Sequence, residues 1–144
     1  MIYLGADHAG FPLKEKIKQF LKKKKLSYQD LSKQFNPTDD YPDVTKKVAL
    51  AVKKDKTNTG ILVCGTGVGI DMAANRFKGI RAAPVYDEYT AVQSRTHNDA
   101  NIICLRGRKF PAKKALKLVD LFLKTPFSGE EKHKRRIKKL DALP

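Results

Sequence analysis

Short apolar runs alternate along this chain with longer stretches in which apolar residues recur every three or four positions. The short runs are typical of buried strands, and the longer spacing is typical of helices that bury one face. The pattern predicts five strands, at about residues 2–5, 26–31, 60–64, 80–85 and 102–105. It predicts helices after Gly10 and at about residues 44–52, 70–76, 87–97, 112–123 and 130–140.

The alternation of strands with helices decides the expected fold class. Parallel neighbours in a sheet need right-handed crossovers, which helices supply, so the sequence predicts an α/β fold. We expect a three-layer Rossmann-like architecture, in which an open parallel sheet of about five strands carries helices on both faces. No repeat or change of composition divides the chain, so residues 1–144 are expected to form a single domain with a basic C-terminal helix at about 130–140.

The chain is strongly basic, with 30 Lys and Arg against 15 Asp and Glu and a formal net charge of +15. Such an excess suggests a polyanionic partner, so a basic nucleic-acid-binding domain is one alternative. The lysines, however, are spread over several segments, of which 22–25, 113–114 and 132–139 are the densest. We therefore expect a solvated, lysine-rich surface and no specific nucleic-acid partner.

Other features narrow the class of protein further. Hydrophobic residues make up 41% of the chain, which argues against a disordered protein. No stretch approaches the roughly 18 apolar residues of a membrane span, and the first residues lack the pattern of a secretory signal. We therefore expect a cytoplasmic protein without membrane contact. Cys64 and Cys104 have no zinc-site spacing, so free thiols and no metal are expected.

Polar side chains follow three of the predicted strands. Asp7 and His8 follow the first strand, residues 64–69 the third, and residues 106–108 the fifth. Ligands of open parallel sheets bind beyond the carboxyl ends of the strands, so we expect a site there. Three glycines within residues 65–69 let the backbone approach a ligand closely and aim free N–H groups at negative charge.

Two common glycine-rich motifs do not fit this turn. The dinucleotide-binding pattern requires a last glycine where this chain has Ile70, and it follows the first strand, whereas this turn follows the third. The Gly-Lys-Ser/Thr of nucleoside triphosphate loops is also absent. A tight turn that binds no ligand is the remaining alternative.

Cys64 and His97 are the candidates for chemistry. Cys64 directly precedes the glycines, where backbone donors and a helix N-terminus favour thiolate over thiol. The alternative is a buried packing residue, which is the role we expect for Cys104. His97, followed by Asn98, could transfer protons near neutral pH, or it could simply interact with the helix dipole.

The last predicted helix carries two cations on one face. Lys132 and Arg136 lie four residues apart, where they could grip a phosphate together. A solvated tail helix is the alternative.

Six fragments in order along nearly the whole chain have the pattern of one known family. They are Gly5-Ala6-Asp7-His8-Ala9-Gly10, Asp40-Tyr41-Pro42-Asp43, Cys64-Gly65-Thr66-Gly67-Val68-Gly69-Ile70, Ala73-Ala74-Asn75-Arg76, Ser94-Arg95-x-His97-Asn98-Asp99-Ala100-Asn101 and His133 to Arg136. Together they resemble the ribose-5-phosphate isomerase B family, which also contains the galactose-6-phosphate isomerase subunits.

The resemblance implies an aldose–ketose isomerase that interconverts ribose 5-phosphate and ribulose 5-phosphate through an enediolate, without metal or organic cofactor. By this resemblance Cys64 removes the proton next to the carbonyl, His97 opens the sugar ring, and the turn that contains Thr66 stabilises the enediolate. The residues that match substrate-binding positions are Asp7, His8, Gly65, Gly67, Val68, Gly69, Asn98, Arg108, Lys132 and Arg136.

The resemblance also implies a homodimer with shared active sites, which could pair into tetramers. His97, Asn98 and Arg108 are then expected from the partner chain. Some relatives use a glutamate within the glycine turn, but Val68 stands at that position here, which favours Cys64 as the base. Lys132 stands where the family usually has arginine. A six-carbon phosphosugar, galactose 6-phosphate or allose 6-phosphate, is the alternative substrate.

Overall fold

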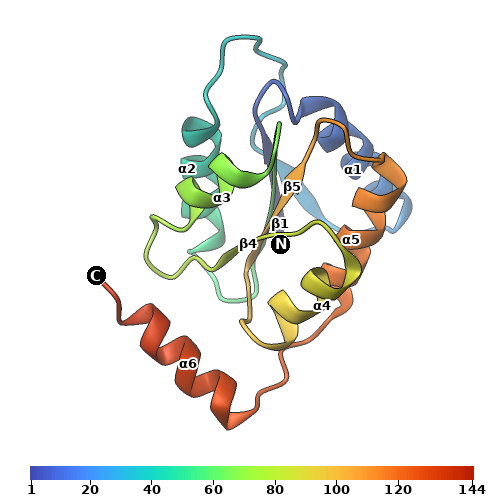
Figure 1. Cartoon of the computed structure of the whole chain (residues 1–144). Coiled ribbons are helices and arrows are strands. Elements are labelled where there is room, and N and C mark those ends of the chain that lie inside the picture. Colours follow the sequence, from blue (N-terminus) through green and yellow to red (C-terminus); the bar gives the residue numbers. More distant parts are fainter.

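The computed structural model describes all 144 residues and contains five strands and six helices (Figure 1). In chain order they are β1 (Ile2–Ala6), α1 (Phe11–Lys23), β2 (Tyr28–Asp30), α2 (Tyr41–Val52), β3 (Thr59–Cys64), α3 (Val68–Ala74), β4 (Ala82–Pro84), α4 (Glu88–Thr96), β5 (Ile102–Arg106), α5 (Ala112–Lys124) and α6 (Glu131–Asp141). Every strand and helix that the hydrophobic pattern predicts is present.

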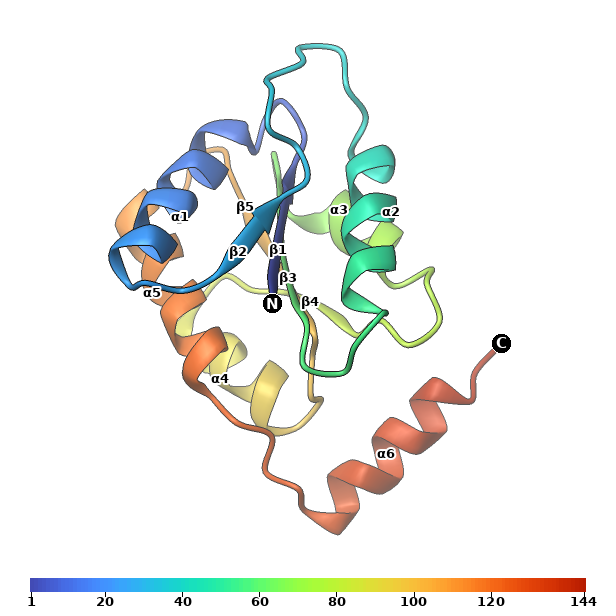
Figure 2. The same cartoon turned by 180° about the vertical axis from the view of Figure 1, so that it is seen from behind.

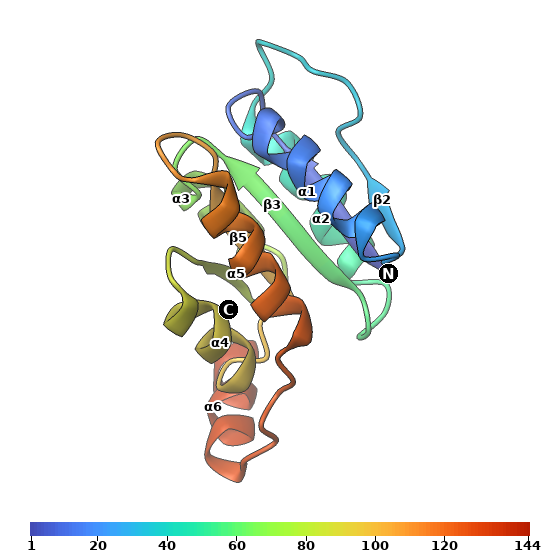
Figure 3. The same cartoon turned by 90° about the vertical axis from the view of Figure 1, so that its right-hand side faces the viewer.

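The strands form one open, all-parallel sheet in the order β2-β1-β3-β5-β4. Helices α2 and α3 cover one face, and α1, α4 and α5 cover the other (Figures 1 and 3). The predicted three-layer α/β fold is therefore confirmed. From the central pair β1 and β3 the chain leads outwards in both directions, so the carboxyl ends of this pair form the crevice in which ligands of such sheets bind.

The side chains of β3 show why its sequence is apolar throughout. Ile61 and Val63 pack into the core under α1 and α5, whereas Leu62 and Cys64 pack into the core under α2. A strand that is covered on both faces has no solvent side that would favour polar residues. Cys104 of β5 is fully buried in the second core, as expected for a packing residue.

Strand β2 is shorter than its predicted range of 26–31 because the end of α1 reaches into that range. Lys25 adopts a left-handed conformation with φ of 56°. Its N–H donates to the Lys22 carbonyl, and the Leu26 N–H donates to the Leu21 carbonyl, both over 3.0 Å. These two bonds form a Schellman motif, which assigns Leu26 to the cap of α1.

Strand β4 is likewise shorter than its predicted range of 80–85. The Ile80 N–H closes a turn onto the Phe77 carbonyl. The Arg81 N–H donates to the side chain of Asn101, 2.9 Å away. Both N–H groups are thus occupied outside the sheet ladder, which begins at Ala82.

Helix α6 is the basic helix expected at 130–140, and it lies beyond the amino ends of the strands, apart from the two helical layers (Figure 2). His133 is its only buried residue. The Arg81 guanidinium contacts the Asp141 carboxylate at its far end over 3.2 Å. None of the helices combines the length and the apolar composition that a membrane crossing requires.

Candidate active site

Cys64 ends β3 at the glycine turn, and its side chain meets a main-chain donor there. The Gly67 N–H donates to Cys64 Sγ over 3.1 Å, and only 4% of Cys64 is exposed. Gly67 has φ of 82°, a conformation that L side chains rarely adopt. An N–H group aimed at sulfur stabilises negative charge on it, so the turn places a hydrogen-bond donor beside this side chain.

The loops after β1 and β5 close around this turn. The Asp7 N–H donates to the Val63 carbonyl over 3.3 Å, and the Gly107 N–H donates to the Cys64 carbonyl over 2.8 Å. Asp7 is buried, and its carboxylate accepts a hydrogen bond from the Gly10 N–H at 2.9 Å. The three clusters expected at the carboxyl ends of the strands therefore meet at one place.

Arg108 also belongs to this group, which corrects the expectation that it comes from the partner chain together with His97 and Asn98. Its N–H donates to the Gly65 carbonyl over 3.1 Å. Its side chain covers Gly65, since a Cβ at that position would lie 3.5 Å from Arg108 Cδ and 3.6 Å from Nη1. The physical reason is the position of Arg108 after β5, which places it at the same sheet edge as Cys64.

His8 is held by a residue that the sequence did not single out. Asp39 Oδ1 lies 2.8 Å from the His8 backbone nitrogen and 3.0 Å from its ring Nδ1. The pKa of His8 is raised above 6.5, mainly by the hydrogen bond to Asp39, while burial opposes the shift and the charge of Asp7 supports it. Asp39 sits in the loop before α2, and only the fold brings it to His8.

Cys104 is chemically different from Cys64 although it also faces the α3 side of the sheet. Complete burial raises the pKa of the Cys104 thiol well above its usual range, and the neighbouring Asp71 adds to the shift. Burial also raises the pKa of Asp71 to about 6, although hydrogen bonds from Cys104 and Asn75 oppose it. Cys104 thus stays a thiol, whereas Cys64 lies at the carboxyl edge of the sheet beside the glycine turn.

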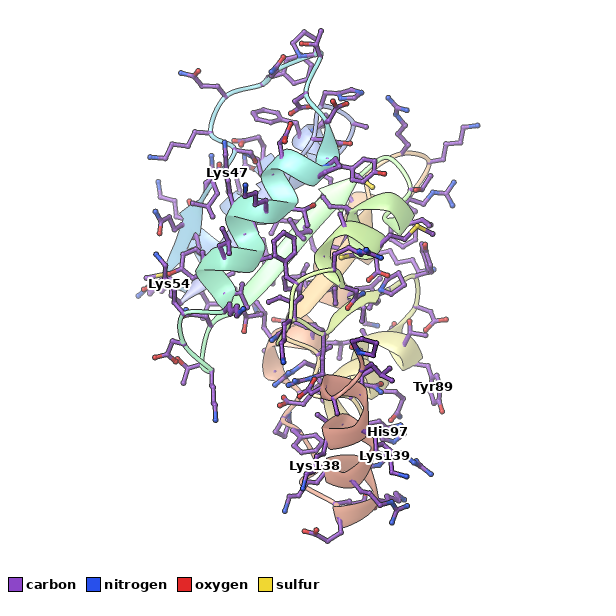
Figure 4. The ribbon with its side chains drawn as sticks, turned by 90° about the vertical axis from the view of Figure 1, so that its left-hand side faces the viewer. Lys47, Lys54, Tyr89, His97, Lys138 and Lys139 are labelled. Atoms are coloured by element: carbon purple, nitrogen blue, oxygen red, sulfur yellow. The ribbon has the colours of Figure 1, made fainter.

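His97 and Asn98 lie at the opposite edge of the sheet. They follow α4 and precede β5, whose last residue, Arg106, pairs with Cys64. The four steps from Ile102 to Arg106 alone rise roughly 13 Å along the strand. Figure 4 shows His97 beside α6, at the lower end of the molecule. Within one chain, therefore, the Cys64 group and the His97 group do not meet.

Helix α6 brings its cations to His97. The imidazoles of His97 and His133 are stacked with ring centroids 4.3 Å apart and an interplanar angle of 16°. Lys132 and Arg136 flank His133 on α6, and Lys132 pairs with Glu130 over 3.0 Å. Burial lowers the pKa of His133, and His97 lowers it further. The second group therefore combines an imidazole pair with two cations.

Arg81 fixes the backbone of the His97 group. Its Nε donates to the carbonyls of Asn98 and Asp99 over 3.0 and 3.1 Å, and Nη2 lies 3.2 Å from the Asp99 carboxylate. Asp99 adopts φ of 45°. The sequence does not reveal this role, because Arg81 belongs to an apolar run and contacts residues 17 or more positions away.

The comparisons with known proteins identify the family of the chain. A sequence model described as Ribose/Galactose Isomerase matches residues 2–140. The chain is 42% identical over 142 residues to a probable ribose-5-phosphate isomerase B from Mycoplasma pneumoniae, with 98% of this chain and 93% of the relative covered.

Solved structures are similar over nearly the whole chain. A ribose 5-phosphate isomerase from Thermotoga maritima matches with a TM-score of 0.94 and 44% identity, covering 99% of this chain and 97% of that one. Ribose-5-phosphate isomerase B from Mycoplasma genitalium, whose structure has ribulose-5-phosphate bound, matches with a TM-score of 0.93 and 45% identity, covering 97% and 93%. The resemblance found in the sequence is thereby confirmed, and this chain belongs to the ribose/galactose isomerase family of isomerases.

Proposed function

We propose that this isomerase interconverts ribose 5-phosphate and ribulose 5-phosphate, with Cys64 as the catalytic base. The contact that carries the proposal is the Gly67 N–H aimed at Cys64 Sγ at 3.1 Å, at the crevice between β1 and β3. The five-carbon substrate is supported by the relatives, which are named ribose-5-phosphate isomerase B, and by the bound ribulose-5-phosphate in the Mycoplasma genitalium enzyme.

The reaction moves one proton between neighbouring carbons. The Cys64 thiolate takes the proton from C2 of the open-chain aldose, and the C2–H electron pair forms the C1–C2 double bond while the carbonyl pair moves to O1. A proton then passes from O2 to O1, and the Cys64 thiol returns its proton to C1, which yields the ketose. The Thr66 hydroxyl both donates and accepts, and is therefore suited to the transfer between the oxygens.

The enediolate carries negative charge on oxygen, and the main chain of the glycine turn supplies donors for it. Residues 65–69 present amide groups at the start of α3, beside the Cys64 sulfur. One such preorganised donor contributes about 2.7–4 kcal/mol of transition-state stabilisation in comparable sites. Arg108 adds a positive charge on the same side, where it covers Gly65.

The cyclic sugar must open before this chemistry, and His97 is proposed to move the proton from the O1 hydroxyl towards the ring oxygen. Lys132 and Arg136 on α6 would then hold the phosphate. Because these groups lie at the amino edge of the sheet, a second copy of the chain must supply them to Cys64. We therefore assign a homodimer in which His97, Asn98, Lys132 and Arg136 act in the partner's site.

Exposed apolar side chains support this assembly. Val68 and Met72 on α3 and Tyr89 on α4 have exposed fractions of 43%, 64% and 70%. Tyr89 extends from the surface in Figure 4. Large exposed apolar groups beside a site are typical of a surface that a second protein covers. We place the enzyme in the cytoplasm, where its two free thiols stay reduced.

The test measures isomerisation and proton exchange in the same variants. Cys64→Ala should fold and lose at least about a hundredfold in kcat for ribose 5-phosphate, the usual contribution of a general base. Its matched control, Cys104→Ala, removes the other thiol and should keep turnover. In D₂O the wild-type enzyme should incorporate solvent deuterium at C1 of ribulose 5-phosphate. Near-normal turnover by Cys64→Ala would overturn the proposal. A kcat/KM that is higher for galactose 6-phosphate or allose 6-phosphate than for ribose 5-phosphate would show that the substrate is a six-carbon phosphosugar.

A further inference from the structure

The imidazole of His8 is held by a carboxylate that none of the proposed catalytic steps uses. A single oxygen of Asp39 accepts from both the backbone N–H and the ring Nδ1 of His8. Because an ionised carboxylate only accepts hydrogen bonds, this contact places a proton on Nδ1. The other ring nitrogen, Nε2, points away from Asp39 and has no partner within the chain.

The loop that carries Asp39 is braced against the end of β1. The Ala6 N–H donates to Ser32 Oγ over 3.0 Å. Lys14, whose side chain is fully buried, lies 2.8 Å from Asp30 Oδ2 and donates to the Ser32 carbonyl as well. The loop of residues 31–40 is therefore anchored at Ser32 near its start and at Asp39 near its end, where it contacts His8.

We propose that Asp39 is a positioning residue for the isomerisation: it fixes the His8 ring and stabilises its imidazolium form, in which Nε2 also carries a proton and donates to an oxygen of the sugar phosphate. This inference rests on the proposed function. Asp39 and Asp7 both favour the imidazolium form, whereas partial burial opposes it, and the result is a pKa of His8 above 6.5. Arg108, which covers Gly65 beside Ala9, is the cation of the same loop cluster.

The first measurement uses the free enzyme, without substrate. Imidazole ¹H–¹⁵N spectra can follow the titration of all three histidines, with the His8 signals assigned from a His8→Gln variant. Asp39→Asn should lower the pKa of His8 and leave the remaining spectrum unchanged. The control is Asp40→Asn, which removes the same charge one residue later from an exposed side chain without hydrogen bonds, and it should leave the titration of His8 in place.

The second measurement is the pH profile of kcat/KM. If the imidazolium of His8 binds the substrate, activity is lost as pH rises through the pKa of His8. In Asp39→Asn this loss should occur at lower pH, so that the ratio of wild-type to variant kcat/KM is larger at pH 8 than at pH 6. A purely structural role of Asp39 would lower kcat/KM equally at both pH values.

The two measurements separate this inference from the proposed function. An unchanged His8 titration in Asp39→Asn, or an equal loss of activity at both pH values, overturns the role of Asp39 even if the enzyme isomerises ribose 5-phosphate. Absence of any phosphosugar isomerisation by the wild-type protein overturns the proposed function, and with it the role of Asp39, whatever the spectra show.

Discussion

Gly67→Ala tests whether the amide beside Cys64 is needed for catalysis. At φ of 82° a side chain costs roughly 1–2 kcal/mol, and the new Cβ would lie 3.1–3.3 Å from backbone atoms of Leu105 and Arg106. Strand β5 is paired with a strand on each side and cannot move, so the turn must shift and the Gly67 N–H must move away from Cys64 Sγ. Loss of one such donor should lower kcat by about 10²–10³-fold.

Gly79→Ala is the matched control for backbone strain. Gly79 has φ of 84°, and a Cβ there would meet nothing within 4 Å. The same strain of roughly 1–2 kcal/mol should lower the Tm of either variant by about 3–8 °C. Steady-state kinetics and thermal unfolding of both variants should therefore show a loss of stability in each, larger in Gly67→Ala because of its contact with β5, but a loss of kcat only in Gly67→Ala. If Gly67→Ala kept its kcat, or Gly79→Ala lost as much, the role of the Gly67 amide would be refuted.

Two further predictions concern the ring-opening step and a buried acid. His97→Ala should lose about 10²–10⁴-fold in kcat/KM for ribose 5-phosphate. The loss should be far smaller for erythrose 4-phosphate, because this sugar cannot close a five-membered ring and needs no ring opening. Equal losses for the two substrates would contradict the role of His97. The pKa of Asp71 is raised from 3.8 to about 6 in the folded state, so its contribution to stability is present below pH 3.8 and is lost as pH rises through 6. In urea titrations, Asp71→Asn should thus have the same free energy of unfolding as the wild type near pH 4 and a higher one than the wild type above pH 6. A difference in unfolding free energy that does not change with pH would contradict the burial of this carboxyl.

The sequence predicts the fold and the meeting of the polar clusters around Cys64 because both depend on local patterns. The alternation of apolar runs and helical stripes specifies an α/β sheet, and the polar residues after three strands meet because parallel strands end at one edge. The end of α1 is different. It depends on the left-handed Lys25, whose conformation carries no signal in a lysine-rich run.

Contacts between distant segments account for the rest. Asp39 contacts His8, 31 positions away, from a loop that carries no motif. Arg81 contacts Asn98, 17 positions away, from an apolar run that carries no motif either. By contrast, the order of elements along the chain is enough to predict the edge of the sheet at which Arg108 lies. A residue after β5 lies at the carboxyl edge, whereas His97, before β5, lies at the amino edge.

The central claim is that one catalytic site needs Cys64 of one chain and His97 of another. Cys64→Ala and His97→Ala dimers should each be nearly inactive, because every site lacks one group. In a hybrid of the two variants, one site lacks both groups and the other retains both.

Unfolding and refolding an equal mixture of the two variants tests this claim most directly. Random pairing makes about half of the dimers hybrids, so the mixture should recover about one quarter of wild-type activity. Recovery of no activity beyond the sum of the two separate variants, with hybrid dimers demonstrated in the mixture, would show that Cys64 and His97 do not act in a shared site.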